Sequence, residues 1–457
     1  MSDVKRTSDA RAEGSDLAQY LAAVRLFSRN ARLYLVHIVG MDLIHGTWEV
    51  LFNLYLLALF ASAGGVTLFG QQLHPIEFVG LRLAVGALAS GIGSLPAGLL
   101  SDRIGRKASF ILGDGGGAVV ALLNVLIVDP LFLLLTPIAS SVLGSLHHVS
   151  ETAFMAENSE SRERVHLFSV GYSLSTAVGM VGALIAASHP AVVAWFGEQL
   201  VAYRVLTFAG IGLWFFSLVP ALMLREQPPD PAPATADGVR TRQVKIGLGS
   251  IRHPGLVARL VVSGALLSVG YGAALPFLSV FFHEHLHAQE QEIGVTFAAV
   301  SGFVALGALL APLVAARVGR VRGVVITRFA AVPFILALAF SPASSGGATL
   351  GLSLVGAAVA LRAVMVSLSV PLAESFAMEI LDPSERATMV GLESAAGSLL
   401  RAAASVMGAV WMAGGDFQTP FLLAAACYLA STALFWIFFR RLDPQPRSEL
   451  QAVPSAA

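Results

Sequence analysis

The segment GLLSDRIGRK, residues 98–107, is a short charged turn between two apolar stretches at about 76–100 and 108–128. A helix needs about 20 apolar residues to cross roughly 30 Å of hydrocarbon, and both stretches have this length. The segment therefore predicts two membrane-spanning helices that are joined at one membrane surface.

The composition excludes a water-soluble fold. Hydrophobic residues make up 56% of the chain and charged residues 13%, whereas a soluble domain carries about 25% charged residues. The net charge is zero and there is no basic tail, so no nucleic-acid partner is indicated. The single cysteine, Cys427, excludes an internal disulfide. Residues 1–32 are polar and arginine-rich and are not expected to be a cleavable signal peptide, so the first spanning helix would direct insertion.

The pattern of apolar stretches is six, a polar linker, and six more. The expected spans are 33–60, 76–100, 108–128, 130–154, 166–188 and 201–224, and then 256–282, 293–316, 323–341, 349–376, 388–411 and 419–439. The linker is rich in proline, alanine and charge and cannot fold alone. The sequence thus predicts an all-α integral membrane protein with 12 helices in two six-helix bundles. Its expected parts are a cytoplasmic arm (1–32), a first bundle (33–224), a cytoplasmic linker (225–255), a second bundle (256–439) and a cytoplasmic tail (440–457).

Orientation follows from lysine and arginine, because basic loops stay in the cytoplasm. Basic residues lie in the N-terminal arm, in 103–107, 162–164, the linker and 317–322, and at Arg386. The connections 61–75, 283–292 and 411–420 contain neither lysine nor arginine. We therefore expect a multi-pass protein of the cell membrane with both termini in the cytoplasm.

The two halves contain similar segments. SDRIGRK (101–107) has a weaker echo in ARVGRVR (316–322), and ETAFMAENSESRER (151–164) has one in AESFAMEILDPSER (373–386). Both recur after roughly half the chain, as a parallel duplication requires. A fold built of two related bundles places its binding site at their interface.

The segment 98–107 resembles the signature of the major facilitator superfamily between its second and third helices, with a Gly, an Asp-Arg pair and a Gly-Arg-basic run at this spacing. The resemblance implies the two-bundle fold, alternating access around a central cavity, and a gating role for the loop. The loop residues concerned are Gly98, Asp102, Arg103, Gly105, Arg106 and Lys107. Gly98 would allow close helix approach, Gly105 a tight turn, and Asp102 could pair with Arg103, Arg106 or a helix terminus and so lock one conformation. A basic loop that only directs topology is the alternative.

Two departures limit what the resemblance implies about coupling. The fourth helix lacks the arginine that drug–proton antiporters of this superfamily usually carry, and the fifth lacks the proline of their Gly-Pro element. Antiport is suggested by the resemblance, but proton handling is not carried over from these motifs.

The first helix holds polar residues at membrane depth, where ionisable groups are costly. His45, Glu49 and Asn53 lie three, seven and eleven residues after Asp42, which places the four on one face. We expect this face to line the cavity. Asp42 and Glu49 are the proton-coupling candidates, since a carboxyl group there can load and release a proton. Hydrogen bonding between neighbouring helices is the alternative role.

The fourth helix holds a second polar group, His147, His148 and Glu151. A histidine here could relay protons. Adjacent histidines cannot share a face, so at least one is expected to serve packing, and no metal site is predicted because further ligands are not evident. Asp114 in the third helix is a secondary candidate that could pair with the loop 98–107 or contact solute.

Arg362 and Arg401 lie about midway along the tenth and eleventh spans, and Glu393 lies about two turns before Arg401 on nearly the same face. These arginines either neutralise acids such as Glu393 and those of the first helix, or receive an anionic substrate. Pairing within the protein is weighted slightly higher. Arg82 and Arg204 are expected near external helix ends, where their side chains can reach the membrane surface.

The predicted function is secondary active transport of a small solute by alternating access, coupled to protons, with efflux of drug-like or metabolite solutes favoured. An uptake symporter for a solute or organic anion, or an uncoupled facilitator, is the alternative. The sequence contains no nucleotide-binding loop, nucleophile elbow or clustered metal-ligand motif, so no enzyme activity is expected. The expected partners are the substrate and the lipid bilayer, with a proton gradient in place of any cofactor and a monomer as the default.

Overall fold

The structure, a computed structural model, describes residues 27–159, 161–226, 251–343 and 349–442. Within these ranges, eleven helical spans are long and apolar enough to cross a membrane. α11 (Glu290–Val318) adds a further long helix of 29 residues. Most of the predicted N-terminal arm, linker and C-terminal tail lies outside the described residues.

The first half of the chain forms six long helices and a few short elements. α2 (Arg29–Ser62) leads through a hairpin of β1 (Val66–Leu68) and β2 (Gln71–Leu73) into α3 (Pro75–Ile104). α4 (Arg106–Leu126), α5 (Pro130–Glu157), α6 (Ser161–Ala187), the short α7 (His189–Phe196) and α8 (Gln199–Leu222) follow. Proline at the first helical position starts α3 and α5, and the side chain of the preceding His74 or Asp129 caps a free backbone N–H.

The second half repeats this pattern. α9 (Pro254–Ala274) continues through η2 (Leu275–Phe277), α10 (Leu278–Val280) and η3 (Phe281–His285) as one span. α11, α12 (Arg320–Ala339), α13 (Thr349–Ile380), α14 (Pro383–Ala413) and α15 (Gln418–Phe439) complete it. The all-α fold class with its two sets of long helices is confirmed. The β-hairpin, α7 and the irregular turns after Ala274 were not predicted, because such short elements leave no periodic pattern.

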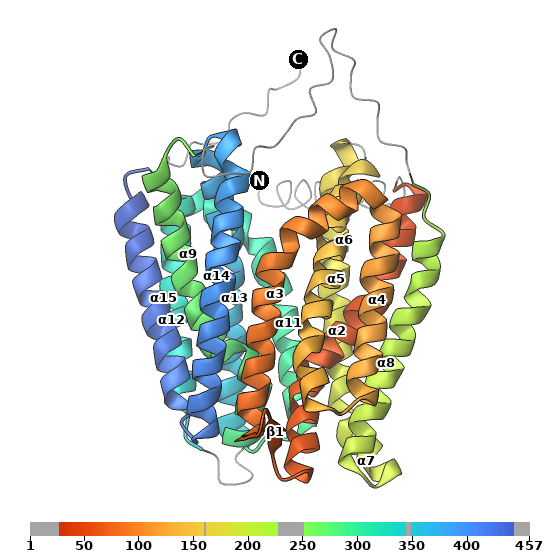
Figure 1. Cartoon of the computed structure of the whole chain (residues 1–457). Helices are drawn as coiled ribbons and strands as arrows, with labels where there is room; N and C mark the ends of the chain where they lie inside the picture. The colour runs from red at the N-terminus through yellow and green to blue at the C-terminus, as the bar shows by residue number, and fades with distance from the viewer. Residues whose placement is uncertain (1–26, 160, 227–250, 344–348, 443–457) are drawn as a thin grey trace, which may run out of the picture.

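The helices form two bundles that meet along two helix pairs (Figure 1). α3 packs along α14, and α6 packs along α11. Glycine brings the first pair close, since a Cβ on Gly80 or Gly91 of α3 would collide with Ala409 or Ser398 of α14. A larger residue at either position would force the two bundles apart.

The end of the molecule that carries β1, β2, α7 and η3 is called the hairpin end. The opposite end, where α8 ends and α9 begins, is called the linker end (Figure 1). One apolar cluster at the hairpin end contains side chains of both bundles, among them Phe60 and Phe78 of the first and Phe281 and Phe421 of the second. Burying apolar surface between the bundles stabilises their contact at this end.

Polar contacts also join the bundles at the hairpin end. The Asn53 side-chain amide donates to the Pro276 carbonyl at 3.1 Å, and the Tyr203 hydroxyl donates to Glu290 at 2.6 Å. At the linker end the apolar side chains instead form separate clusters, one in each bundle. Beyond Pro96, α3 bends away from α14 (Figure 1). The bundles are therefore sealed at the hairpin end and part toward the linker end.

Candidate functional site

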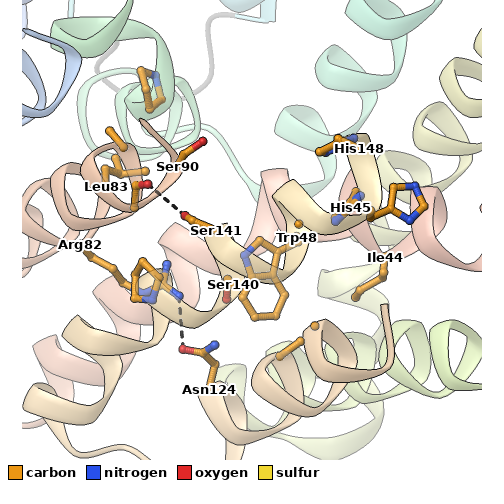
Figure 2. A pocket seen from close by; sticks show the side chains of 18 of the residues that line it. Ile44, His45, Trp48, Arg82, Leu83, Ser90, Asn124, Ser140, Ser141 and His148 are labelled. Carbon is orange, nitrogen blue, oxygen red and sulfur yellow. Dashed lines mark hydrogen bonds between the residues drawn. The ribbon is translucent and has the colours of Figure 1, made fainter. Parts of the chain in front are cut away.

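A cavity of about 450 Å³ lies between the bundles, about midway along the helices. Its wall comes mainly from α2, α3, α4 and α5, while Tyr271 and Arg401 reach it from the second bundle. His45, Trp48 and Arg82 surround the same hollow (Figure 2). The volume is in the range of small-molecule sites.

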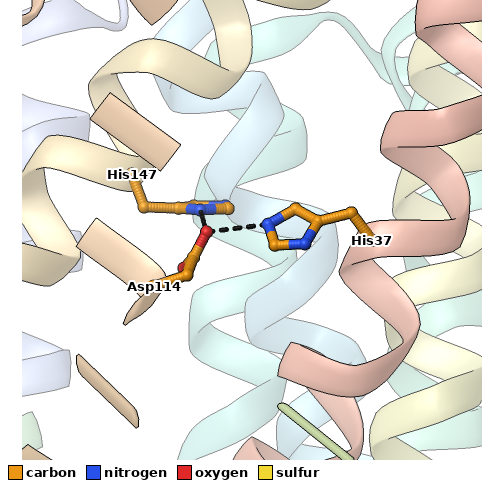
Figure 3. A group of neighbouring side chains, drawn as sticks. All are labelled: His37, Asp114 and His147. Carbon is orange, nitrogen blue, oxygen red and sulfur yellow. Dashed lines mark hydrogen bonds and ion pairs between the residues drawn. The ribbon is translucent and has the colours of Figure 1, made fainter. Parts of the chain in front are cut away.

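A buried cluster of His37, Asp114 and His147 reaches the wall of this cavity. Asp114 Oδ2 lies 2.8 Å from His37 Nε2 and 2.8 Å from His147 Nδ1, so both rings approach one oxygen (Figure 3). His37 Nδ1 donates to the Ser217 carbonyl at 2.8 Å, and the Tyr34 hydroxyl lies 3.4 Å from His147 Nε2. The cluster joins α2 to α4, α5 and α8, and Asp114 and His147 line the cavity.

The hydrogen bonds of the cluster determine how many protons it holds. The bond to the Ser217 carbonyl and the two bonds to Asp114 need three protons, one for each pair of heavy atoms. Two neutral imidazoles and an ionised carboxylate carry only two. The geometry therefore requires one additional proton, with which the cluster has no net charge. Its loss would leave a buried negative charge, which is unfavourable away from water.

The same three groups could in principle offer ligand atoms to a metal ion, since these atoms lie within 4.8 Å of one another. They contact one another directly, and an ion would have to break both hydrogen bonds to Asp114. A structural zinc site also needs a fourth ligand. The donor and acceptor pattern fits a proton better than a metal.

The structure separates the four polar residues of α2. His45 lines the cavity. Asp42 is buried with Ser175 of α6 as its hydrogen-bonding neighbour, and Asn53 bonds across to the second bundle. Glu49 is exposed and does not line the cavity. Only His45 thus lies where all four were expected.

The adjacent histidines of α5 have different surroundings, as predicted. His147 is buried in the cluster with Asp114, whereas the His148 side chain is 69% exposed. His148 lines the cavity, and its Nδ1 lies 3.8 Å from the Glu151 carboxylate. Glu151 itself is not among the cavity-lining residues.

Arg82 lies inside the cavity, contrary to the expectation that it extends to the membrane surface. Its Nε donates to the Leu133 carbonyl at 3.1 Å and its Nη2 to Asn124 Oδ1 at 3.2 Å (Figure 2). The guanidinium also lies over the Phe52 ring, 4.5 Å from its centre. These contacts hold a cation at membrane depth without an acidic partner among the described residues.

Neither mid-membrane arginine of the second bundle forms an ion pair with an acid among the residues that the structure describes. Arg362 donates to the Tyr428 hydroxyl at 3.0 Å and is buried. Arg401 lies over the Tyr271 ring, 5.5 Å from its centre, and lines the cavity. Glu393 instead faces α9, where a Cβ on Gly264 would meet its carboxylate.

The loop of residues 98–107 forms the predicted turn. Gly105 adopts φ 88° and ψ 163°, a conformation that favours glycine. Asp102 accepts a hydrogen bond from Arg106 Nη1 at 2.9 Å, which confirms that pairing. Arg103 is exposed and Lys107 half-buried.

Gly98 does not serve close helix approach in this conformation. A Cβ there would lie 3.6 Å from Val149, an ordinary contact, so that expectation is wrong here.

The echo between the halves extends to their ion pairs. Arg106 of α4 pairs with Glu157 of α5 at 3.3 Å, and Arg320 of α12 pairs with Glu379 of α13. Each pair joins two helices of the same bundle. The gating role of the loop therefore stays a prediction, because these described contacts do not join the bundles.

Sequence reasoning missed His37 and misplaced Arg82. His37 is a lone histidine in an apolar run, and its partner Asp114 is 77 residues away, so no local pattern links them. Arg82 lies two turns inside an apolar stretch, and its depth was the signal that could have identified it.

Comparison with known proteins gives a clear family match. A family model described as Major Facilitator Superfamily matches residues 50–361 and 260–455. No curated protein sequence matches the chain.

Solved structures with a similar fold include the nucleoside transporter NupG and a bacterial homologue of the human lysosomal transporter Spinster, the latter in an inward-facing and unoccupied conformation. The structure of a NupG mutant gives a TM-score of 0.69, and the match covers 90% of this chain and 100% of the NupG chain. The NupG structure without the mutation gives a TM-score of 0.66, with 90% of this chain and 99% of the NupG chain covered. The Spinster homologue gives 0.63 and covers 92% of this chain and 100% of its own. Sequence identity is 14% in each case, which shows the shared fold alone. With the family model matching most of its length, the chain belongs to the Major Facilitator Superfamily and is a transporter of a small solute rather than an enzyme.

Proposed function

We propose that the transporter is coupled to protons and that the cluster of His37, Asp114 and His147 carries the coupled proton. The observation that supports this is the pair of hydrogen bonds from two histidines to one oxygen of Asp114, which needs an additional proton. This assignment replaces Asp42 and Glu49 as the first candidates, since neither lines the cavity. Other titratable side chains around the cluster are Tyr34, Asp42, His45, His148 and Glu151.

The position of the cluster suggests how a proton would act on the transport cycle. His37 belongs to α2, whereas Asp114 and His147 belong to α4 and α5. Loss of the proton removes one of the hydrogen bonds that hold α2 against these helices and leaves a buried charge beside the cavity. The loaded and unloaded states would therefore favour different helix arrangements, which is what coupling requires.

We propose that the linker end faces the cytoplasm, with both termini on that side of the cell membrane. The basic loops at residues 103–107 and 317–322 lie at this end, as the positive-inside rule requires of cytoplasmic loops. The conformation described here would then be open to the cytoplasm, like that of the Spinster homologue.

Export of drug-like or metabolite solutes in exchange for protons is the direction we propose, and it rests on the resemblance of the loop motif. Uptake by symport and uncoupled passage are the competing modes. In vesicles, exchange and symport acidify opposite compartments for the same solute flux, and a facilitator moves no protons.

The test uses purified protein in liposomes that contain a pH-sensitive dye, screened with small solutes of different charge. We expect at least one solute to drive proton movement, and Asp114→Asn to abolish it while the variant stays folded. Glu198→Gln is the matched control, because this exposed acid lies in a loop at the hairpin end. Asp42→Asn and Glu49→Gln test the earlier candidates in the same assay.

Two outcomes would contradict the proposal. Solute flux without proton movement would make the protein a facilitator or couple it to another ion. Normal coupling in Asp114→Asn, together with loss of coupling in Asp42→Asn or Glu49→Gln, would move the proton site to Asp42 or Glu49.

A further inference from the structure

The cavity has an imbalance between hydrogen-bond donors and acceptors. Arg401 Nε and Trp214 Nε1 are buried and have no hydrogen-bond partner in the described part of the chain. Both residues line the cavity. Buried donors are nearly always satisfied in folded proteins, so a molecule bound in the cavity could supply the acceptor that these two donors lack.

The charges of the cavity wall point the same way. Arg82 and Arg401 carry permanent positive charges, and Asp114 is the only acid among the lining residues that the structure describes. Asp114 is already occupied by two histidines. Neither arginine has a described carboxylate within the 4.0 Å of an ion pair. The wall is therefore short of negative charge.

The two arginines come from opposite bundles and lie close enough to share a ligand. Gly80 faces Ala409 and Gly91 faces Ser398, so α3 and α14 run antiparallel in a fixed register. This register separates Arg82 and Arg401 by roughly 9 Å along the helix axes, at 1.5 Å per residue. Side chains of this length, aimed into one cavity, can contact the same small molecule.

Apolar surface completes the wall. Trp48, Trp214, Met41 and Leu83 line the cavity together with the arginines. Trp48 is held in place by stacking on Phe52, with ring centres 3.8 Å apart. A ligand that matches this wall has an anionic head and an apolar or aromatic body.

We propose that the cavity binds an organic anion, with its carboxylate, sulfonate or phosphate head between Arg82 and Arg401 and its body against the tryptophans. The inference rests on the proposed transport function, because it names the class of solute that would be carried. Its test does not depend on that function, since binding can be measured without transport. Among the two roles expected for a mid-membrane arginine, it assigns substrate binding to Arg401 and adds Arg82 from the first bundle.

The test measures binding to the purified protein of three compounds with the same ring and different permanent charge. These probes are benzenesulfonate, neutral benzenesulfonamide and cationic phenyltrimethylammonium. We expect benzenesulfonate to bind most tightly, with quenching of tryptophan fluorescence as the readout. Arg401→Gln should weaken benzenesulfonate binding about tenfold or more, since charge-assisted hydrogen bonds are lost. Affinity for the sulfonamide should stay within about threefold.

The control variant is Arg259→Gln, which removes an exposed arginine that lies over Phe438, outside the cavity. It should bind benzenesulfonate like the wild type. Arg82→Lys is a second test, since it keeps the positive charge but loses the planar guanidinium group. Because Arg82 also donates hydrogen bonds to Asn124 and Leu133, the melting temperature of this variant is measured alongside its binding.

Three results would overturn the proposal: no benzenesulfonate binding to the wild type at millimolar concentration, tightest binding of the cation, or unchanged binding in Arg401→Gln. Failure of proton coupling is a separate outcome. Benzenesulfonate binding is measured on the wild type without a proton gradient, so an anion site without proton flux would reject only the coupling proposal.

Discussion

His37 lies between two oxygen atoms, the Ser217 carbonyl oxygen and Asp114 Oδ2, each 2.8 Å from a ring nitrogen. Replacing it by leucine leaves the Ser217 carbonyl unpaired and Asp114 with a single histidine. Unsatisfied buried groups cost about 1–3 kcal/mol each. We therefore expect His37→Leu to lower the thermal unfolding midpoint in detergent clearly below that of the wild type.

The matched control is Val36→Leu at the neighbouring position, which is exposed and should leave the midpoint nearly unchanged. If both variants unfolded at the same temperature, the His37 hydrogen bonds would contribute nothing to folding, and a role in holding α2 against α4 would have to be abandoned.

Single residues show where sequence reasoning reaches its limit. His147 and Arg401 were found because a charged or titratable group within an apolar stretch is costly wherever it points. His37 could not be identified as a candidate site residue, because its hydrogen-bonding partner Asp114 lies 77 residues away in the sequence. Arg82 is expected at the membrane surface because it lies near a helix end, but its side chain lines the cavity instead.

At the scale of elements, the start of α14 is tied to the start of α9 through Glu385. Its fully buried carboxylate accepts hydrogen bonds from the backbone N–H groups of Arg252 and His253 and lies 3.2 Å from His253 Nδ1. Burial alone would raise the pKa of Glu385, but these hydrogen bonds outweigh it and hold the pKa below its usual range. The position lies before the membrane span of α14, which begins at Thr388.

Because the pKa of Glu385 is lower in the folded than in the unfolded state, its ionised carboxylate stabilises the folded protein at pH values above the unfolded-state pKa. This stabilisation is lost as the pH falls through the pKa of the folded state. We expect the wild type to melt above Glu385→Gln near neutral pH, with the difference shrinking below about pH 4. Thermal unfolding at a series of pH values measures this. Glu198→Gln, which removes an exposed acid, is measured as the control. A difference for Glu385→Gln that does not change with pH would rule out the ionised carboxylate as the joint.

The elements themselves were largely predictable, because length and hydropathy locate a spanning helix whatever its neighbours are. The register between neighbouring helices, that is, which residues face each other, was not predictable. Gly80 and Gly91 set the contact of α3 with α14, yet nothing in the sequence distinguishes them from glycines such as Gly98 that have ordinary contacts here.

For the whole molecule, the two proposals together predict a response to voltage. Export of a monovalent anion in exchange for one proton moves two positive charges inward per cycle, worth roughly 4.6 kcal/mol per 100 mV. Benzenesulfonate export from the compartment that faces the linker end should therefore accelerate when that compartment is made negative with a potassium diffusion potential. The measurement is the initial flux in proteoliposomes.

Symport of one proton with one anion moves no net charge, so its flux would not respond to the same potential. That result would favour the uptake symporter over the exchanger. Arg259→Gln, which lies outside the cavity, should respond to voltage like the wild type.

The two-bundle plan was visible in the repeated segments, and Arg106 and Arg320 occupy matching places in both. Which end is closed could not be predicted. One sequence must support every conformation of the cycle, and its apolar residues do not indicate which of them are buried together at a given moment.

The seal at the hairpin end has a consequence for how the protein responds to temperature. Opening it would bring aromatic side chains such as Phe60, Phe78, Phe281 and Phe421 into contact with water. Hydration of apolar surface is governed by entropy near room temperature and carries a large heat capacity. The turnover rate should then follow a curved rather than a straight Arrhenius line, and that curvature would come from the phenylalanines that close one end of the molecule rather than from the polar groups that bind its cargo.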